Sequence, residues 1–206
     1  VPERTEYIRA GVFDAGNHVG VFLSSAEKRA MLKYDEEQAE NLKKIVADTY
    51  IDMPFAKAYN KIFSLMDDGK SFAFHCTAGK DRTGVCAFMI ESAFGRSIDD
   101  CEKEYLLSND YRADTNNKLF FLMKLLHVSK PAFDAIRYAI TVEKRNFDIM
   151  LNSIFEKYNS IDEYLEKEFA TFDCVVADSE KDVQTDGLTA IIPFDMPLLM
   201  ELLFVS

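Results

Sequence analysis

The stretch FAFHCTAGKDRTGVCAFMIESAFG, from Phe72 to Gly95, limits the possible folds of this chain more than any other segment. An apolar run ends at Cys76, a short turn follows, and apolar residues with helical spacing begin near Thr83. The run Ser71–Cys76 lacks polar alternation, which favours a buried strand. The sequence therefore predicts a strand, a loop and a helix in direct succession.

The loop has the makings of an anion-binding site. Successive backbone N–H groups of residues 77–82 can converge on one point, and the following helix adds the positive end of its dipole. Gly79 lets the backbone turn tightly. We therefore expect a bound phosphate to be held by residues of the loop and of the first helical turn. These are Thr77, Ala78, Gly79, Lys80, Thr83 and Gly84.

Cys76 stands at the mouth of this loop, where the same dipoles favour its thiolate. Arg82 can present a planar guanidinium to two phosphate oxygens, and Thr83 can hydrogen-bond the thiolate. A thiolate facing phosphorus, with donors around the oxygens, is the arrangement for phosphoryl transfer to cysteine. Asp81 is the candidate general acid for the leaving group, and a carboxylate that merely favours the helix N-terminus is the alternative. We expect Lys80 at the rim, either meeting further phosphate on the substrate or simply solvated.

The other cysteines and the neighbouring histidine fit structural roles. His75 is expected to order the loop by hydrogen bonding and not to act as a base, because a base would compete with the thiolate, which is already ionised. Cys86, Cys101 and Cys174 are expected to be core thiols, with a disulfide between Cys86 and Cys76 as the alternative.

The segment HCTAGKDRTG resembles the HCxxGxxR[ST]G loop of the protein-tyrosine-phosphatase superfamily. The form of the loop with Lys80 and Asp81 directly before Arg82 resembles that of a branch of bacterial, often secreted, phosphatases. That branch acts on phosphotyrosine, sometimes on phosphoserine or phosphothreonine, and on phosphoinositides. EYLLSNDYR (Glu104–Arg112), MPFAKAYNKIF from Met53 and IFEKYNSIDEYLEKEF (Ile154–Phe169) are similar to segments of the same branch, so the resemblance covers about residues 50–170.

This resemblance implies that Cys76 is the nucleophile, Arg82 the phosphate-binding residue and Asp81 the general acid, with neither metal nor cofactor. It associates Lys80 with phosphoinositide recognition. It implies an α/β fold with a small central sheet surrounded by helices, helix-rich after the active loop, in a single domain over residues 1–206.

The chain lacks the NFRDLGG-like motif and the DLR strand with which the branch usually begins. We expect either a trimmed or rearranged chain, or a sheet completed by the tail. Two tail segments have the composition of strands, namely Cys174–Asp178 and Leu188–Phe194.

Helices are predicted over most of the chain between residues 35 and 170. Ser97 is expected to cap one helix, Pro131 to open another, and Ser160 with Glu163 to form a capping box. Residues 131–158 have a continuous helical pattern. The predicted segments are 35–50, 56–69, 83–94, 97–112, 115–127, 131–158 and 160–169.

Composition excludes several classes of function. The formal net charge of −11 argues against general nucleic-acid binding, which needs a basic surface. The four cysteines form no CxxC pair, so neither a zinc site nor a disulfide scaffold is expected. No apolar run is long enough for an integral membrane segment, and both a cytoplasmic and a secreted bacterial protein stay open. The predicted partner is a phosphorylated protein, a phosphoinositide being the alternative substrate and a catalytically silent phosphate-binding module the alternative function.

Overall fold

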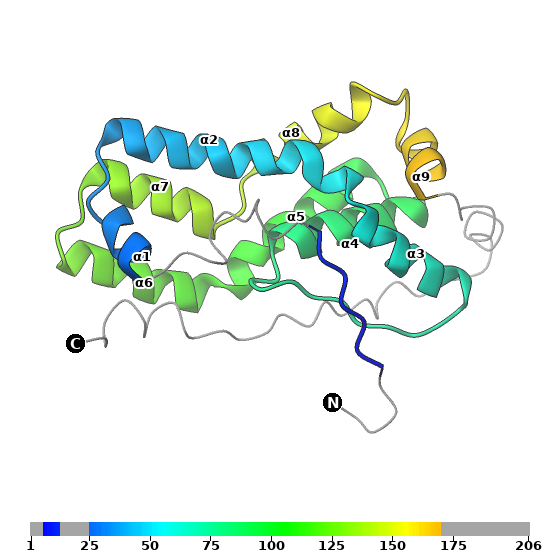
Figure 1. Cartoon of the computed structure of the whole chain (residues 1–206), viewed down its shortest axis with the longest axis horizontal. Coiled ribbons are helices and arrows are strands. Elements are labelled where there is room, and N and C mark those ends of the chain that lie inside the picture. The colour runs from blue at the N-terminus through cyan, green and yellow to red at the C-terminus, as the bar shows by residue number, and fades with distance from the viewer. Residues whose placement is uncertain (1–5, 13–24, 170–206) are drawn as a thin grey trace.

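The computed structural model describes residues 6–12 and 25–169, and the regular secondary structure in these ranges is helical (Figure 1). Short 3₁₀ turns, η1 and η2, join two of the α-helices. The elements are α1 (Ser25–Met31), α2 (Glu36–Asp52), η1 (Met53–Phe55), η2 (Lys57–Tyr59), α3 (Asn60–Asp67), α4 (Asp81–Ala93), α5 (Ile98–Tyr111), α6 (Ala113–Leu125), α7 (Lys130–Ile140), α8 (Lys144–Phe155) and α9 (Ile161–Phe169).

Helix α4 is the centre of the fold. Its buried residues lie on every side of the helix, as expected of a helix enclosed by others. It packs against α5, α9 and η1, and its first turn directly follows the candidate loop. The packing of α5, α9 and η1 against α4 therefore also fixes the position of the loop.

Helix α2 supplies one wall of this enclosure. Asp35 caps it through a capping box, in which its side chain accepts from the backbone N–H of Gln38 at 2.9 Å and its own N–H bonds the Gln38 side chain at 3.2 Å. Leu42, Val46 and Tyr50 then recur at helical spacing on its buried face. This face packs against α7 and α8, which run beside α2 (Figure 1).

The predicted helix starts are confirmed where a local cap defines them. The Ser97 side chain accepts from the N–H of Asp100 at 3.2 Å, and α5 begins at the next residue. Pro131 lies in the first turn of α7. Ser160 accepts from the N–H of Glu163 at 3.0 Å, whereas the Glu163 carboxylate bonds Asn159 instead of completing a capping box.

The continuous helix expected over residues 131–158 is divided into α7 and α8 at residues 141–143. The cause is tertiary. The Asn109 amide of α5 accepts from the N–H of Val142 at 3.0 Å and donates to its carbonyl at 2.8 Å, so both backbone groups are bonded outside a helix. The break leaves the carbonyl of Thr141 free to meet the candidate loop.

The prediction of an α/β fold with a small central sheet is wrong for the described residues, which contain no strand. Residues 71–76 alternate between exposed and partly buried side chains, with Phe72 and Phe74 against the core, and so keep the two-residue period of extended chain. A strand also needs a neighbour to complete its backbone hydrogen bonds. No other described segment provides one, and the N–H of Cys76 bonds the Thr83 side chain instead. The tail segments Cys174–Asp178 and Leu188–Phe194 lie outside the described ranges.

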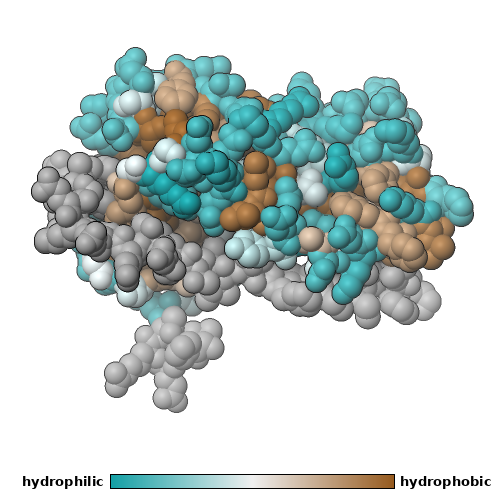
Figure 2. Space-filling view, turned by 180° about the vertical axis from the view of Figure 1, so that it is seen from behind, coloured by the Kyte–Doolittle hydropathy of each residue, from teal (hydrophilic) through white to brown (hydrophobic). Residues whose placement is uncertain are grey.

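The surface agrees with the acidic composition. Figure 2 shows a mostly hydrophilic face on which smaller apolar areas are separated by polar side chains. Among the helices of residues 25–169, none has the length and apolar character needed to cross a bilayer.

Candidate active site

The loop of residues 77–80 is shaped by Gly79 and by the helix that follows. Gly79 has a φ of 67°, a left-handed conformation that glycine adopts without strain. Its N–H donates to the Cys76 sulfur at 3.2 Å. The first turn of α4 begins at Asp81, so the positive end of the helix dipole also faces the loop.

Thr83 ties the nucleophile candidate to α4. Its buried hydroxyl accepts from the backbone N–H of Cys76 at 2.9 Å. Burial of the Cys76 sulfur opposes ionisation, but hydrogen bonding by Thr83 and the positive charge of Arg82 outweigh it, while the negative charge of Asp81 opposes them. The pKa of Cys76 is therefore lowered from its ordinary value. The structure thus favours a thiolate at the position where the sequence predicts a nucleophile.

Arg82 lies where it can reach across the loop. Its Nη2 donates to the Thr77 hydroxyl at 3.2 Å, and the hydroxyl of the buried Tyr59 donates to its backbone carbonyl at 3.2 Å. The guanidinium therefore spans the loop from its helical end to its first residue. This position suits a side chain that closes around a bound oxyanion.

Asp81 belongs to a hydrogen-bonded network that faces the inside of the protein. The hydroxyl of Tyr50, on α2, donates to its Oδ1, and the Lys80 ammonium lies 2.7 Å from the same oxygen. The Tyr105 hydroxyl in turn donates to that of Tyr50 at 2.8 Å. Both donors contact the same carboxylate oxygen, and the Asp81 side chain is 26% exposed.

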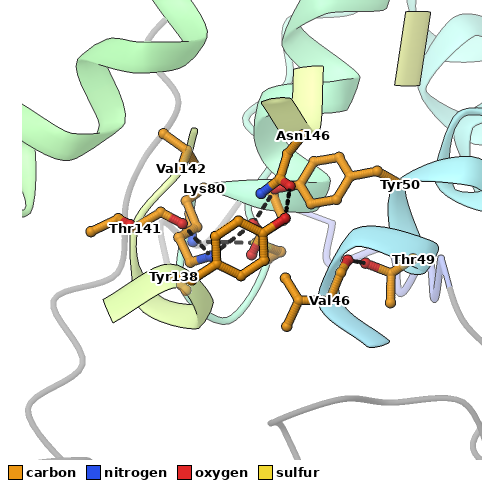
Figure 3. A network of polar contacts seen from close by, with 12 residues as sticks. Val46, Thr49, Tyr50, Lys80, Tyr138, Thr141, Val142 and Asn146 are labelled. Atoms are coloured by element: carbon orange, nitrogen blue, oxygen red, sulfur yellow. Dashed lines mark hydrogen bonds and ion pairs between the residues drawn. The ribbon is translucent and has the colours of Figure 1, made fainter. Parts of the chain in front are cut away.

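Lys80 is buried, unlike the rim lysine that the sequence predicts. Its side chain is only 6% exposed, and its ammonium also donates to the Thr141 carbonyl at 3.3 Å (Figure 3). Tyr138 and Asn146 lie in the same network, with the hydroxyl of Tyr138 donating to the Asn146 side chain (Figure 3). The α7–α8 break therefore holds Lys80 inward, against Asp81.

Burial keeps the two tyrosines of this network protonated. Burial, and then the negative charge of Asp81, raise the pKa of Tyr50 well above its ordinary value. Burial, and then Asp81, also raise the pKa of Tyr105. Both hydroxyls are therefore neutral donors at any working pH.

Gly84 allows the network to form. A Cβ at this position would lie 2.7 Å from Cδ2 of the Tyr105 ring. The absence of a side chain lets α5 approach α4 closely enough for Tyr105 to reach Tyr50. Gly84 was predicted to help bind phosphate, and its visible contact in the structure is this packing.

The segment Glu104–Arg112 contributes three contacts that the sequence reasoning did not assign. Tyr105 reaches Tyr50, and Asn109 fixes the α7–α8 break. Arg112 donates from Nη1 to the loop carbonyl of Ala78 at 2.8 Å. The resemblance of this segment to the phosphatase branch was a signal, but it did not tell which of its residues contact the loop.

His75, Cys86 and Cys101 have the structural roles expected of them, whereas Cys174 lies outside the described residues. His75 is exposed, and its Nδ1 lies 3.1 Å from the Cys76 carbonyl, which can only accept. Cys86 and Cys101 are buried free thiols. Burial raises the pKa of both, that of Cys101 to about 12. Within the described ranges no group of three His, Cys, Asp or Glu side chains is arranged to hold a metal ion.

The chain resembles known tyrosine phosphatases over most of its length. Residues 2–176 match the model of a tyrosine phosphatase family, a longer stretch than the 50–170 covered by the recognised segments. The chain belongs to this tyrosine phosphatase family. It is 32% identical over 120 residues to a Cupriavidus necator protein named "Putative tyrosine-protein phosphatase". That match covers 57% of this chain and 43% of the relative, so the chain spans less than half the length of that protein.

Proposed function

We propose that this protein hydrolyses phosphomonoesters, with phosphotyrosine as the preferred substrate, through a phosphocysteine intermediate. The observation that supports this most directly is the donor set around Cys76. Gly79 donates its N–H to the Cys76 sulfur, and Thr83 and the positive charge of Arg82 lower the pKa of this thiol. A thiolate at the entrance of a loop of backbone donors is suited to attack phosphorus and poorly suited to a merely structural role.

In the first step the Cys76 thiolate attacks phosphorus, and the bond from phosphorus to the substrate oxygen breaks. The leaving oxygen takes a proton from the Asp81 carboxyl group, while the Arg82 guanidinium and the N–H groups of residues 77–82 hold the phosphoryl oxygens. Thr77, Ala78, Gly79, Lys80, Thr83 and Gly84 are the proposed loop and first-turn residues of this site.

In the second step water attacks the phosphorus of phosphocysteine and gives a proton to the Asp81 carboxylate. The sulfur–phosphorus bond breaks, inorganic phosphate leaves, and the thiolate is restored with the help of the Thr83 hydroxyl. One water is consumed, and one alcohol or phenol and one phosphate are produced. The cycle needs no metal or redox step.

Phosphoinositide hydrolysis is the competing substrate hypothesis, and it depends on Lys80. The Lys80 ammonium is buried and bonded to Asp81 and to the Thr141 carbonyl. An ammonium held inward by these two contacts is poorly placed to bind a second phosphate on an inositol ring. This contact favours a phosphotyrosine substrate.

The test is release of inorganic phosphate from a phosphotyrosine peptide, a phosphoserine peptide and phosphatidylinositol phosphates in vesicles. Cys76→Ser should reduce release to background, and Cys101→Ser is the matched control for loss of a buried thiol outside the loop. Asp81→Asn keeps an acceptor for Tyr50 and Lys80, and should slow substrates with poor leaving groups by about 10²–10⁴-fold. Acid quenching of wild type should trap phosphate on Cys76.

Full activity of Cys76→Ser would contradict the mechanism. No phosphate release from any substrate by a folded wild-type protein would favour a phosphate-binding module without catalysis. Faster phosphate release from phosphoinositides than from peptides would contradict the preference for phosphotyrosine and favour the lipid substrate.

A further inference from the structure

Arg112 contacts the loop from the corner between α5 and α6. Its backbone closes α5 through its N–H to the Ser108 carbonyl at 3.2 Å, and its carbonyl accepts from the N–H of Asn116 at 2.9 Å in α6. The side chain extends from this fixed point to the Ala78 carbonyl, where Nη1 donates at 2.8 Å. Its Nε is buried and has no partner in the part of the chain that the structure describes.

The Ala78 carbonyl belongs to the same peptide group as the Gly79 N–H. In a trans peptide the C=O and N–H groups lie in one plane and point in opposite directions. The described residues of this chain contain no cis peptide. Arg112 takes the carbonyl end, and the Cys76 sulfur takes the N–H end at 3.2 Å. One rigid peptide group therefore connects the guanidinium with the proposed nucleophile.

This peptide group needs a contact that fixes its orientation. Gly79 has a φ of 67°, and glycine adopts positive and negative φ about equally well. The peptide before a glycine can therefore turn over with little backbone cost. In the turned form the Ala78 carbonyl oxygen would point at the sulfur and at any bound phosphoryl group. The negative end of the carbonyl dipole would repel both of these anions.

We propose that Arg112 is a positioning residue that fixes the Ala78–Gly79 peptide with its N–H towards Cys76 and towards the bound phosphoryl group. The inference rests on the proposed function, because it treats Cys76 as the nucleophile. The bond is charge-assisted and hence stronger than a neutral one. The positive charge also polarises the peptide, which makes the Gly79 N–H a better donor to an anion.

The test is the pH dependence of Cys76 alkylation by iodoacetamide in the full chain, with the modified Cys76 peptide quantified by mass spectrometry. The rate follows the thiolate fraction and needs no substrate. Three variants separate the parts of the contact. Arg112→Lys keeps a charge and a donor, Arg112→Gln keeps a neutral donor, and Arg112→Met keeps only the length.

We expect the pKa of Cys76 to rise in the order wild type, Arg112→Lys, Arg112→Gln, Arg112→Met. The last variant should be shifted by about one unit, which makes alkylation below that pKa about tenfold slower. Affinity for tungstate, an oxyanion without hydrolysis, should fall in the same order. Arg137→Gln is the control for general loss of one positive charge, because that side chain is half exposed and pairs with Glu143 at 4.0 Å. It should leave the titration unchanged.

A titration in Arg112→Met that matches wild type, in protein with an intact melting transition, would overturn the inference. So would equal shifts in all three Arg112 variants, because a merely structural loss would not be rescued by lysine. If Arg112→Met does not fold, the comparison of Arg112→Lys and Arg112→Gln with wild type decides. Failure of the proposed function appears separately, as phosphate release that persists in Cys76→Ser whatever the thiol titration shows.

Discussion

Replacing Tyr50 by phenylalanine tests whether the network behind Asp81 serves catalysis. Tyr50 is 1% exposed, and its hydroxyl donates to Oδ1 of Asp81. Phenylalanine removes this hydroxyl and leaves the ring in place. The lost contact is a hydrogen bond to a carboxyl group that becomes negatively charged as it gives up its proton, worth about 1.5–3 kcal/mol.

If that contact acts in the transition state, the loss corresponds to roughly 10–150-fold in rate, at about 1.4 kcal/mol for each factor of ten. The carboxylate would retain only Lys80, at 2.7 Å, and could turn towards it. Proton delivery to the leaving group should suffer most. Phenyl phosphate, with its strongly basic leaving oxygen, should therefore lose more activity than 4-nitrophenyl phosphate.

The assay measures kcat/KM for both aryl phosphates in wild type, Tyr50→Phe and Tyr105→Phe. Tyr105→Phe is the matched control, because it removes a hydroxyl one step further from Asp81 and keeps the Tyr50 contact. It should cause the smaller loss. The double variant should regain part of the stability lost in Tyr50→Phe, since the single change leaves the Tyr105 hydroxyl without its acceptor.

Equal losses on both aryl phosphates would refute the reasoning, because a general disturbance of the fold does not distinguish leaving groups. An unchanged rate on phenyl phosphate would refute it as well, and would show that Asp81 does not depend on Tyr50. Thermal melts of each variant separate these outcomes from simple unfolding.

Three further changes test the loop and its support. Gly84→Ala should lower the free energy of unfolding by about 1–3 kcal/mol in urea melts, because its Cβ would lie 2.7 Å from the Tyr105 ring; an unchanged midpoint would contradict the close packing of α4 and α5. Lys80→Met should lower kcat on phosphotyrosine peptides about tenfold, because the ammonium contacts Asp81; slower hydrolysis of phosphoinositides alone would contradict this. The stability of wild type relative to Cys76→Ser should increase with pH, from the lowered pKa of the folded thiol up to about 8.5, where the unfolded thiol ionises. A difference that stays constant over that range in pH-dependent melts would show that the folded thiol is not perturbed.

Features with a local cause were predictable from the sequence. Ser97 caps α5 through a contact three residues away, and Pro131 lies in the first turn of α7, as its own geometry favours. The loop chemistry is also local, because Cys76, Gly79 and Thr83 lie within eight consecutive residues and the last two both contact Cys76. Such contacts depend on spacing along the chain, which a sequence states directly.

The predicted strand at Ser71–Cys76 failed for the opposite reason. Its composition is suitable and its side chains alternate, but a strand is completed by a neighbour that the segment itself does not contain. The break between α7 and α8 is similar, since it is caused by Asn109, 33 residues before Val142. Periodicity within residues 131–158 could not reveal it.

Lys80 shows how the same limit applies to function. Beside Asp81 in a turn, it has the sequence of an exposed rim lysine, but its ammonium donates to the Thr141 carbonyl, 61 residues later, on the buried side. Tyr50 and Arg112 likewise contact the loop from 31 and 34 residues away. The reactive groups are therefore encoded in one short segment, while their orientation depends on three distant contacts, from α2, from the break between α7 and α8, and from the corner between α5 and α6. Substitutions at these three distant contacts should therefore change the rate of the reaction although every residue of the loop stays the same.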